Sequence, residues 1–188
     1  MNTTTTPQSN RSISTQNMVI IGLITAITCI IAPFSIPLPF SPVPITLTNL
    51  VLYISPYILG TKKSTISYII YLLLGTVGLP IFSGFAGGLG KLVGPTGGYL
   101  IGFIFLVAVT GIFVEKCGSR RILVLIGMIL GTAICYIFGT FWLAKQLEMT
   151  FVAALAVGVT PYLIGDFVKM IIAICIGPVL RSRLTNVN

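Results

Sequence analysis

The chain has 188 residues, which is enough for one domain. Apolar residues make up 55% of it and charged residues only 7%, whereas soluble domains carry roughly 25% charged residues. So few charges exclude an ordinary water-facing surface, and the sequence predicts a membrane protein. The net charge of +8 does not indicate a nucleic-acid partner, because the basic residues lie in short groups between apolar runs and form no stripe.

Few residues in this sequence could support catalysis or hold a metal. It has no histidine, and its four cysteines, Cys29, Cys117, Cys135 and Cys175, form no CxxC pair. No metal site and no cofactor are therefore expected. With three acidic residues and no nucleophile–base pair, the chain is not expected to be an enzyme.

The N-terminal segment 1–17 is rich in Thr, Ser and Asn, which predicts a disordered lead-in. The apolar run after it is expected to be a retained helix, because it leads into prolines and no small-residue cleavage site follows. Residues 18–183 are predicted to form a single transmembrane domain, and residues 184–188 a C-terminal tail.

Six apolar runs in this domain have 16 to 22 residues, which is short but adequate to cross a bilayer, for which about 20 residues are needed. The predicted helices cover residues 18–34, 45–60, 65–82, 98–114, 122–143 and 161–180. The expected fold class is therefore an all-α membrane protein of six transmembrane helices. The mixed segment 144–160 is expected to form a short interfacial helix.

Prolines and lysines set the expected boundaries of the second helix. The five prolines from Pro33 to Pro44 exclude a helix between them. Pro44 is expected to open the second helix and Pro56 to kink it. Lys62 and Lys63 are expected to end it before the third helix begins.

The distribution of lysine and arginine predicts the orientation in the membrane. With a cytoplasmic N-terminus, eight basic residues lie inside and two outside, while Lys169 lies within a span. The inside residues are Arg11, Lys62, Lys63, Lys116, Arg120, Arg121, Arg181 and Arg183, and the outside residues are Lys91 and Lys145. Both termini of this multi-pass protein of the cell membrane are therefore predicted to be cytoplasmic, with the loops after the first and third helices outside.

Asp166 and Lys169 are the charged residues that lie inside an apolar span. Each costs roughly 2.5–3.5 kcal/mol at the centre of a membrane helix, and a spacing of three residues places them on one face. That face is expected to point into the bundle. Two interpretations stay open: a structural ion pair without a ligand, or a polar pocket open to the outside that binds a ligand with amide N–H and carbonyl or carboxylate groups.

Two further segments could contribute to the same outer pocket. In the glycine-rich loop at 83–97, Gly87 and Gly88 allow the backbone to approach a ligand closely. The loop lacks GxxxxGK[ST], so it is no phosphate loop; it is either a flexible exposed loop or a lid that folds back over the pocket. Thr46 and Asn49 share a face at the outer end of the second helix and could supply donors and acceptors.

Small residues four apart occur in the first helix, at Gly22 and Ala26. The same spacing recurs at Gly98/Gly102 and Gly127/Gly131. This spacing lets membrane helices pack closely. It indicates either close packing within the bundle or docking to a partner.

Several short motifs together resemble one known family. They are PVPIT at Pro42 to Thr46, GFAGG at Gly84 to Gly88, GPTGGY ending at Tyr99, GTFWL at Gly139 to Leu143, and GDFVK at Gly165 to Lys169. In combination they resemble the BioY family over residues 18–183. Members of that family are the biotin-binding S components of energy-coupling factor transporters.

The resemblance implies a six-helix fold with a biotin pocket near the outer face, capped by the loops after the first and third helices. It also implies a complex with a transmembrane coupling subunit and two cytoplasmic ATPase subunits, embedded in membrane lipid. Asp166 and Lys169 match the polar pair of the family. Gly22 and Ala26 match its small-residue docking motif, with glycine where alanine is usual.

High-affinity biotin binding and uptake is therefore the expected function. Some family members carry a polar or basic residue where this chain has Ala86 and Leu100. Lys91 is a candidate partner of the biotin carboxylate, since it is one of two basic residues predicted to lie outside. The expected biotin-binding residues are Thr46, Asn49, Gly87, Gly88, Lys91, Tyr99, Asp166 and Lys169. The alternatives are an S component for another vitamin such as thiamine or riboflavin, a structural membrane scaffold, and a vitamin facilitator that works without ATPases.

Overall fold

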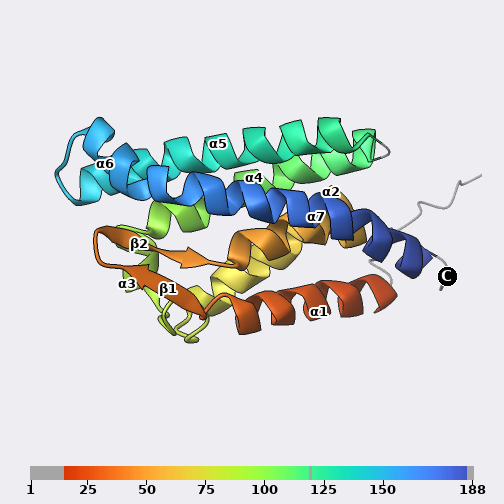
Figure 1. The fold of residues 1–188 in the computed structure, drawn as a ribbon. Helices are drawn as coiled ribbons and strands as arrows, with labels where there is room; N and C mark the ends of the chain where they lie inside the picture. Colours follow the sequence, from red (N-terminus) through yellow and green to blue (C-terminus); the bar gives the residue numbers. More distant parts are fainter. Residues whose placement is uncertain (1–14, 119, 186–188) are drawn as a thin grey trace, which may run out of the picture.

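The computed structural model describes residues 15–118 and 120–185 as a bundle of long helices with a small sheet at one end (Figure 1). The helices are α1 (Thr15–Ile31), α2 (Thr48–Thr76), α3 (Leu89–Val93), α4 (Gly97–Cys117), α5 (Arg121–Gln146), α6 (Phe151–Gly158) and α7 (Leu163–Thr185). A 3-10 turn, η1 (Thr160–Tyr162), precedes α7. Figure 1 shows β1, β2, α3 and α6 at one end of the bundle and the turn between α4 and α5 at the other.

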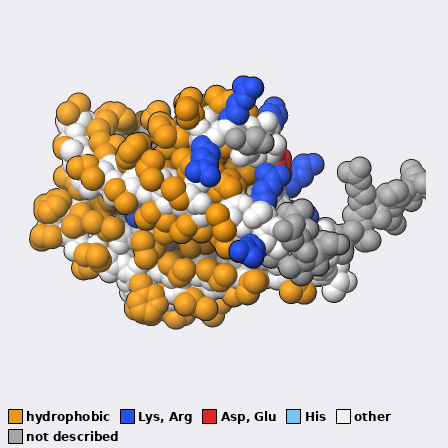
Figure 2. Space-filling view, turned by 45° about the vertical axis from the view of Figure 1, so that its right-hand side comes forward, with side chains coloured by type: hydrophobic (Ala, Val, Ile, Leu, Met, Phe, Trp, Pro, Cys, Tyr) orange, Lys and Arg blue, Asp and Glu red, His pale blue; other side chains and the backbone are white. Residues whose placement is uncertain are grey.

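The surface of the bundle has the character expected of a membrane protein. Within the described residues, the stretches long and apolar enough to cross a membrane are Gly97–Cys117, Arg121–Gln146 and Phe151–Arg183, and α1 is a shorter apolar helix. Large apolar side chains such as Ile137 and Phe141 are exposed on the outside of the helices, and they cover most of the face seen in Figure 2. Hydrocarbon is the solvent that suits such a surface, so the prediction of a helical membrane protein is confirmed.

The second and third predicted helices form the single element α2, which reverses at Gly60. Gly60 has φ +75° and ψ 176°, outside the helical region, and glycine tolerates this φ because it has no Cβ. The first half of α2 runs from Asn49, beside Asp166, to Thr61, beside Glu115. The second half runs back toward the other end of α4. The break agrees with the predicted end of the second helix at residue 60, but Lys62 and Lys63 do not form it, because they already lie in the second half of α2.

Pro56 does not produce the kink that the sequence predicted, since the non-helical backbone of α2 is at Gly60. Proline removes the N–H that would bond to the carbonyl four residues earlier. In this helix the hydroxyl of Ser55 donates to that carbonyl, the Leu52 O, at 3.3 Å. A serine hydroxyl can satisfy a carbonyl freed in this way, so the proline is accommodated within the helix.

The proline-rich segment after α1 forms a hairpin of strands β1 (Ser35–Leu38) and β2 (Ser41–Thr46). The strands are antiparallel, with Ser35 opposite Thr46 and Leu38 opposite Ser41. Prolines fit because both strands are edge strands, in which an N–H can be missing. The fold is therefore not purely α-helical, and Pro44 lies in β2 instead of opening a helix.

The ends of the domain also differ from the predicted boundaries. Helix α1 begins at Thr15, so residues 15–17 belong to the bundle and not to a disordered lead-in; residues 1–14 lie outside the described part of the chain. Helix α7 continues to Thr185, so the predicted tail at 184–188 is wrong for its first two residues, and 186–188 are also outside the described part. The segment 144–160 contains the predicted short helix, as α6.

Glycines allow α4 and α5 to pack closely. A Cβ added at Gly98 would lie 2.3 Å from the Cβ of Trp142, and one added at Gly131 would lie 2.9 Å from the carbonyl oxygen of Leu106. Added Cβ atoms at Gly102 and Gly127 would likewise meet Cys135 and Phe113. At these four positions the small-residue spacing therefore serves close packing within the bundle.

Candidate ligand-binding site

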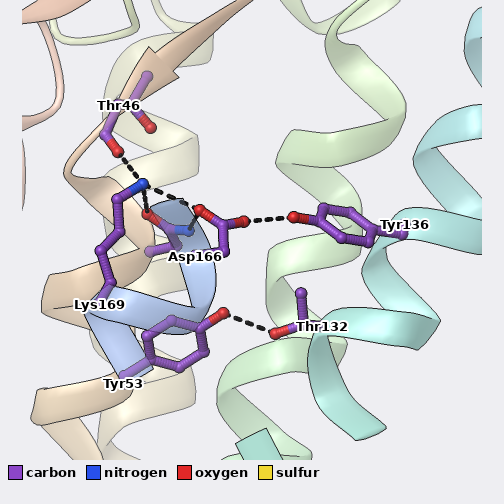
Figure 3. A network of polar contacts seen from close by, with 7 residues as sticks. Thr46, Tyr53, Thr132, Tyr136, Asp166 and Lys169 are labelled. Carbon is purple, nitrogen blue, oxygen red and sulfur yellow. Dashed lines mark hydrogen bonds and ion pairs between the residues drawn. The ribbon is translucent and has the colours of Figure 1, made fainter. Parts of the chain in front are cut away.

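The two charges of α7 lie at the end of the bundle that carries the hairpin. Asp166 is 7% exposed and Lys169 is 9% exposed, and their Oδ1 and Nζ atoms are 2.9 Å apart. A spacing of three residues puts both on the same face of α7, and Figure 3 shows that this face points into the bundle. The predicted ion pair is therefore present, and it is buried.

Lys169 uses all three ammonium protons within the protein. Besides the bond to Asp166, Nζ donates to the carbonyl oxygen of Thr46 at 2.7 Å and to Oδ1 of Asn49 at 3.0 Å (Figure 3). Thr46 is the last residue of β2, and Asn49 lies in the first turn of α2. The ammonium therefore connects α7 to the hairpin and to the start of α2.

Asp166 is held by donors from two other helices. Its Oδ1 accepts from Nδ2 of Asn49 at 2.7 Å, and its Oδ2 accepts from the hydroxyl of Tyr136 on α5 at 2.5 Å. A second phenol, Tyr53, bonds to the Thr132 hydroxyl at 2.6 Å one turn before Tyr136. Buried charges need such compensation to be tolerated, and here the carboxylate and ammonium are compensated by each other and by neutral groups.

A cavity adjoins this network and has mixed walls. The lining includes the polar network itself, several aromatic rings, and hydroxyls from the loops: Val43, Pro44, Thr46, Thr48, Asn49, Tyr71, Ser83, Thr96, Tyr99, Leu100, Phe103, Tyr136, Gly158, Tyr162, Asp166 and Lys169. Apolar and aromatic walls with a few convergent polar groups are typical of small-molecule sites. The arrangement suits a ligand with a flat polar group and an apolar body.

Hydrogen bonds anchor the segments that cap the cavity. The hydroxyl of Tyr162 lies within hydrogen-bond distance of both the Val43 carbonyl and the Ser41 hydroxyl, which share its single proton. The Ser41 hydroxyl donates to the Val157 carbonyl at 2.8 Å. On the other side, the Trp142 indole donates to the Gly94 carbonyl at 3.0 Å. The hairpin is thus tied to α6 and η1, and the loop around α3 is tied to α5.

Five of the eight predicted site residues border the cavity: Thr46, Asn49, Tyr99, Asp166 and Lys169. The described lining does not include Gly87, Gly88 or Lys91. An added Cβ at Gly87 would lie 2.3 Å from the Leu79 carbonyl oxygen, and the N–H of Gly88 donates to the Gly75 carbonyl at 2.7 Å. These glycines fold the loop against the end of α2, and a contact with a ligand stays a prediction.

Lys91 lies in α3, away from the described lining of the cavity. Its side chain is half-buried, and this burial lowers the pKa of its ammonium group. Of the predicted lid residues, Leu92 packs against the core, while Leu89 and Val93 are exposed. The loop therefore folds back onto the bundle through Leu92.

Most of the aromatic lining, above all Tyr136 and Tyr162, was not predicted from the sequence. Each carries a hydroxyl that bonds to a residue more than twenty positions away, so no local pattern identifies the partner. A signal was nevertheless available, because the hydroxyl of a buried tyrosine usually finds a hydrogen-bond partner. Tyr136 stands in a strongly apolar run and follows Thr132 by one helical turn.

Comparisons with known proteins identify the family. A family model described as the BioY family matches residues 3–186. The chain belongs to the BioY family. Similar relatives are a biotin transporter BioY of Thermotoga maritima, 39% identical over 86% of this chain and 93% of that protein, and a probable biotin transporter BioY of Pyrococcus horikoshii, 32% identical over 87% and 95%.

A solved structure agrees with the BioY assignment. The crystal structure of the S-component for biotin from an ECF-type ABC transporter superposes with a TM-score of 0.83 at 29% sequence identity. The match covers 94% of this chain and 95% of that chain. The resemblance in short motifs therefore extends to a similar fold over most of the chain.

Proposed function

We propose that this chain binds biotin at the Asp166–Lys169 network and serves as the S component of a biotin uptake system. The observation that carries the proposal is the buried charged network beside a capped cavity, in a fold similar to an S-component for biotin. Biotin has a ureido ring with two N–H donors and one carbonyl, and a tail with a carboxylate. This is the combination of groups that an acid, an ammonium and an amide can recognise. BioY proteins are transporter components and not enzymes.

The bonds in the network indicate how biotin would enter it. Oδ2 of Asp166 accepts one bond, from Tyr136, and a carboxylate oxygen can accept two, so a ureido N–H can be added. The ammonium of Lys169 has no further proton to donate, because Asp166, Asn49 and Thr46 take all three. A ligand oxygen would therefore replace one of these acceptors, and the Thr46 carbonyl and the Asn49 amide oxygen are the two neutral ones.

Titration of the purified chain tests the substrate. We expect one biotin per chain, bound tightly and without nucleotide, because the proposed contacts all come from this chain. Thiamine and riboflavin serve as matched competitors. Thiamine is a cation, and Asp166, the acid among the described lining residues, is already balanced by Lys169. Clear binding of another vitamin without binding of biotin would refute the assignment of biotin as the substrate.

We further propose that the chain crosses the cell membrane six times, through α1, the two halves of α2, α4, α5 and α7. The eight-to-two distribution of basic residues supports an orientation with both termini in the cytoplasm. In this orientation the hairpin, α3 and α6 lie outside, and the pocket can be loaded from there.

A coupling subunit and two ATPases are the partners that we propose, with α1 as the docking helix. Gly22 and Ala26 are both exposed on α1, and among the described residues no atom comes within 4 Å of a Cβ added at Gly22. Close packing within the bundle is therefore not the role of this pair, in contrast to the glycines between α4 and α5. A smooth groove that is not used inside the chain can receive a partner helix.

Substitution by leucine separates the two classes of small residue. Gly22→Leu and Ala26→Leu should abolish co-purification with the coupling module and leave biotin binding unchanged. Gly98→Leu is the contrast, because it drives a side chain into Trp142 and should unfold the bundle. Retained assembly in both α1 variants would refute docking through this face.

The alternative of a facilitator without ATPases needs a separate measurement. Liposomes that contain the chain alone are compared with liposomes that also contain the coupling module and ATP. We expect biotin to accumulate only in the second case. Equal uptake in both would favour the facilitator.

A further inference from the structure

A second cavity lies at the opposite end of the bundle, where α4, α7 and the first half of α2 come together. Its volume is about 420 Å³, and it is lined by Tyr57, Glu115, Lys116, Gly118, Pro178, Arg181 and Ser182. A Cβ added at Gly118 would lie 2.9 Å from Nη1 of Arg181, so the guanidinium rests against the turn that follows α4. The proposed biotin site uses none of these residues.

Positive charge dominates this cavity. Lys116 and Arg181 line it, and Arg121, at the start of α5, is close enough to act electrostatically on the Tyr57 phenol together with Arg181. Glu115 is the acid among the described lining residues, and its Oε1 accepts the backbone N–H of Thr61 at 2.7 Å. This carboxylate also lies within electrostatic reach of Arg181. Among the described lining residues the two cations, Lys116 and Arg181, still outnumber this one acid.

The surroundings of the cavity are apolar. Ile122 follows Arg121 in α5 and is 75% exposed, and Val179 lies two residues before Arg181 in α7 and is 56% exposed. Figure 2 shows the same boundary on the visible face, with lysine and arginine gathered at one end beside a broad apolar surface. A ligand that reaches both regions needs an anionic head and an apolar body.

We propose that this cavity binds the phosphate headgroup of an anionic phospholipid. The guanidinium of Arg181 and the ammonium of Lys116 can bind phosphate oxygens, and the hydroxyl of Tyr57 adds a neutral donor at the wall. Arg181 can do so beside its own contacts, since a guanidinium has five N–H donors. The acyl chains then lie along Ile122 and Val179. Basic pockets between membrane helices bind anionic headgroups in this way, whereas an acidic protein segment would leave the adjoining apolar surface uncovered.

Lipid titration of the purified, delipidated chain in detergent tests this site. We expect phosphatidylglycerol to bind about tenfold more tightly than phosphatidylcholine, as measured by native mass spectrometry. The double variant Lys116→Gln with Arg181→Gln should lose this preference. Arg183→Gln removes one positive charge two residues further along α7, and Lys145→Gln removes one at the other end of the bundle. Both variants should retain the preference for phosphatidylglycerol.

Three outcomes would overturn the proposal. The first is equal affinity for the two lipids, and the second is an equal loss of the phosphatidylglycerol preference in Arg183→Gln. The third is displacement of phosphatidylglycerol by inorganic phosphate at the same concentration, which would identify a free-anion site. Loss of assembly with the coupling module in the double variant, without any lipid preference in the original chain, would assign the cavity to a protein partner. Helix content and elution volume control for folding, so the result does not depend on biotin binding.

Discussion

At the end of the bundle that carries the hairpin, charge is buried and completely engaged. Asp166 and Lys169 are 7% and 9% exposed, and they share bonds with Asn49, Tyr136 and Thr46. At the opposite end, residues such as Lys62, Lys116 and Arg121 are exposed and extend from the ends of helices. Both ends carry charge, but one encloses it in a capped site and the other exposes it at the surface of the protein.

The difference separates two uses of charge in a membrane protein. Exposed basic residues at one end set the orientation and can meet lipid headgroups at little energetic cost. A buried pair in an apolar helix is expensive, and a scaffold would be as stable with apolar residues in its place. The retention of a fully bonded pair beside a cavity is therefore most simply explained by a ligand.

The strongest contrast between the ends should appear in their accessibility. Cysteines introduced at Ser41 and at Gly88 should react with a membrane-impermeant reagent added to intact cells, and one at Ser119 should not. The expected difference is all or none, because the reagent does not cross the bilayer. Native cysteines are replaced first as a control. The reverse pattern would put the pocket on the cytoplasmic side.

The same substitution at the two ends should have different consequences for biotin. Lys169→Met and Asp166→Asn should each weaken biotin binding about tenfold or more, because an unpaired buried polar group costs about 1–3 kcal/mol or more. Lys116→Met and Glu115→Gln make the matched changes at the other end and should leave the titration unchanged. An equal loss of biotin affinity in both sets of variants would show that the effect is not specific to the Asp166–Lys169 site.

Tyr136 should have an intermediate effect, because it acts on the site through Asp166. Tyr136→Phe removes the donor to Oδ2 and keeps the ring. One such bond contributes about 1 kcal/mol, which corresponds to roughly fivefold in affinity. Tyr57→Phe, at the other end, is the control. Unchanged biotin affinity in Tyr136→Phe would show that this hydroxyl does not contribute to biotin binding.

The smallest effect is expected for Lys91, which lies outside the described lining of the cavity. A partly exposed ion pair contributes up to about 1 kcal/mol, so Lys91→Gln should weaken biotin binding at most about fivefold. Biotin methyl ester provides the sharper comparison, since it lacks the tail carboxylate. If Lys91 binds that carboxylate, Lys91→Gln should weaken the binding of biotin but not of the methyl ester. Lys145→Gln should leave the affinity for both compounds unchanged.

Much of this architecture could be predicted from the sequence, because the bilayer imposes strong constraints on it. Long apolar runs predicted α4, α5 and α7, and the unusual charges at Asp166 and Lys169 identified the centre of the site. The hairpin could not be predicted, because prolines exclude a helix without specifying which strand pairs with which. The end of the second helix at residue 60 was predicted, but its cause was assigned to Lys62 and Lys63, whereas the backbone turns at Gly60, where φ can be positive.

Residues that depend on distant partners were the least predictable. Tyr136 meets Asp166 across thirty residues, and its own neighbours give no sign of this contact. Gly22/Ala26 and Gly98/Gly102 have the same spacing, yet the first pair is exposed and the second is covered by α5. The arrangement of the helices, and not the motif, decides what each pair does.

The double variant Asp166→Asn with Lys169→Met tests the central claim most directly, when its stability and its biotin affinity are both measured. Removal of both charges leaves no unpaired buried ion, so the bundle should regain the stability that either single change loses. If the pair binds biotin, this folded variant stays deficient in binding. A well-folded double variant with the affinity of the original chain would contradict the account and reduce Asp166 and Lys169 to a structural ion pair.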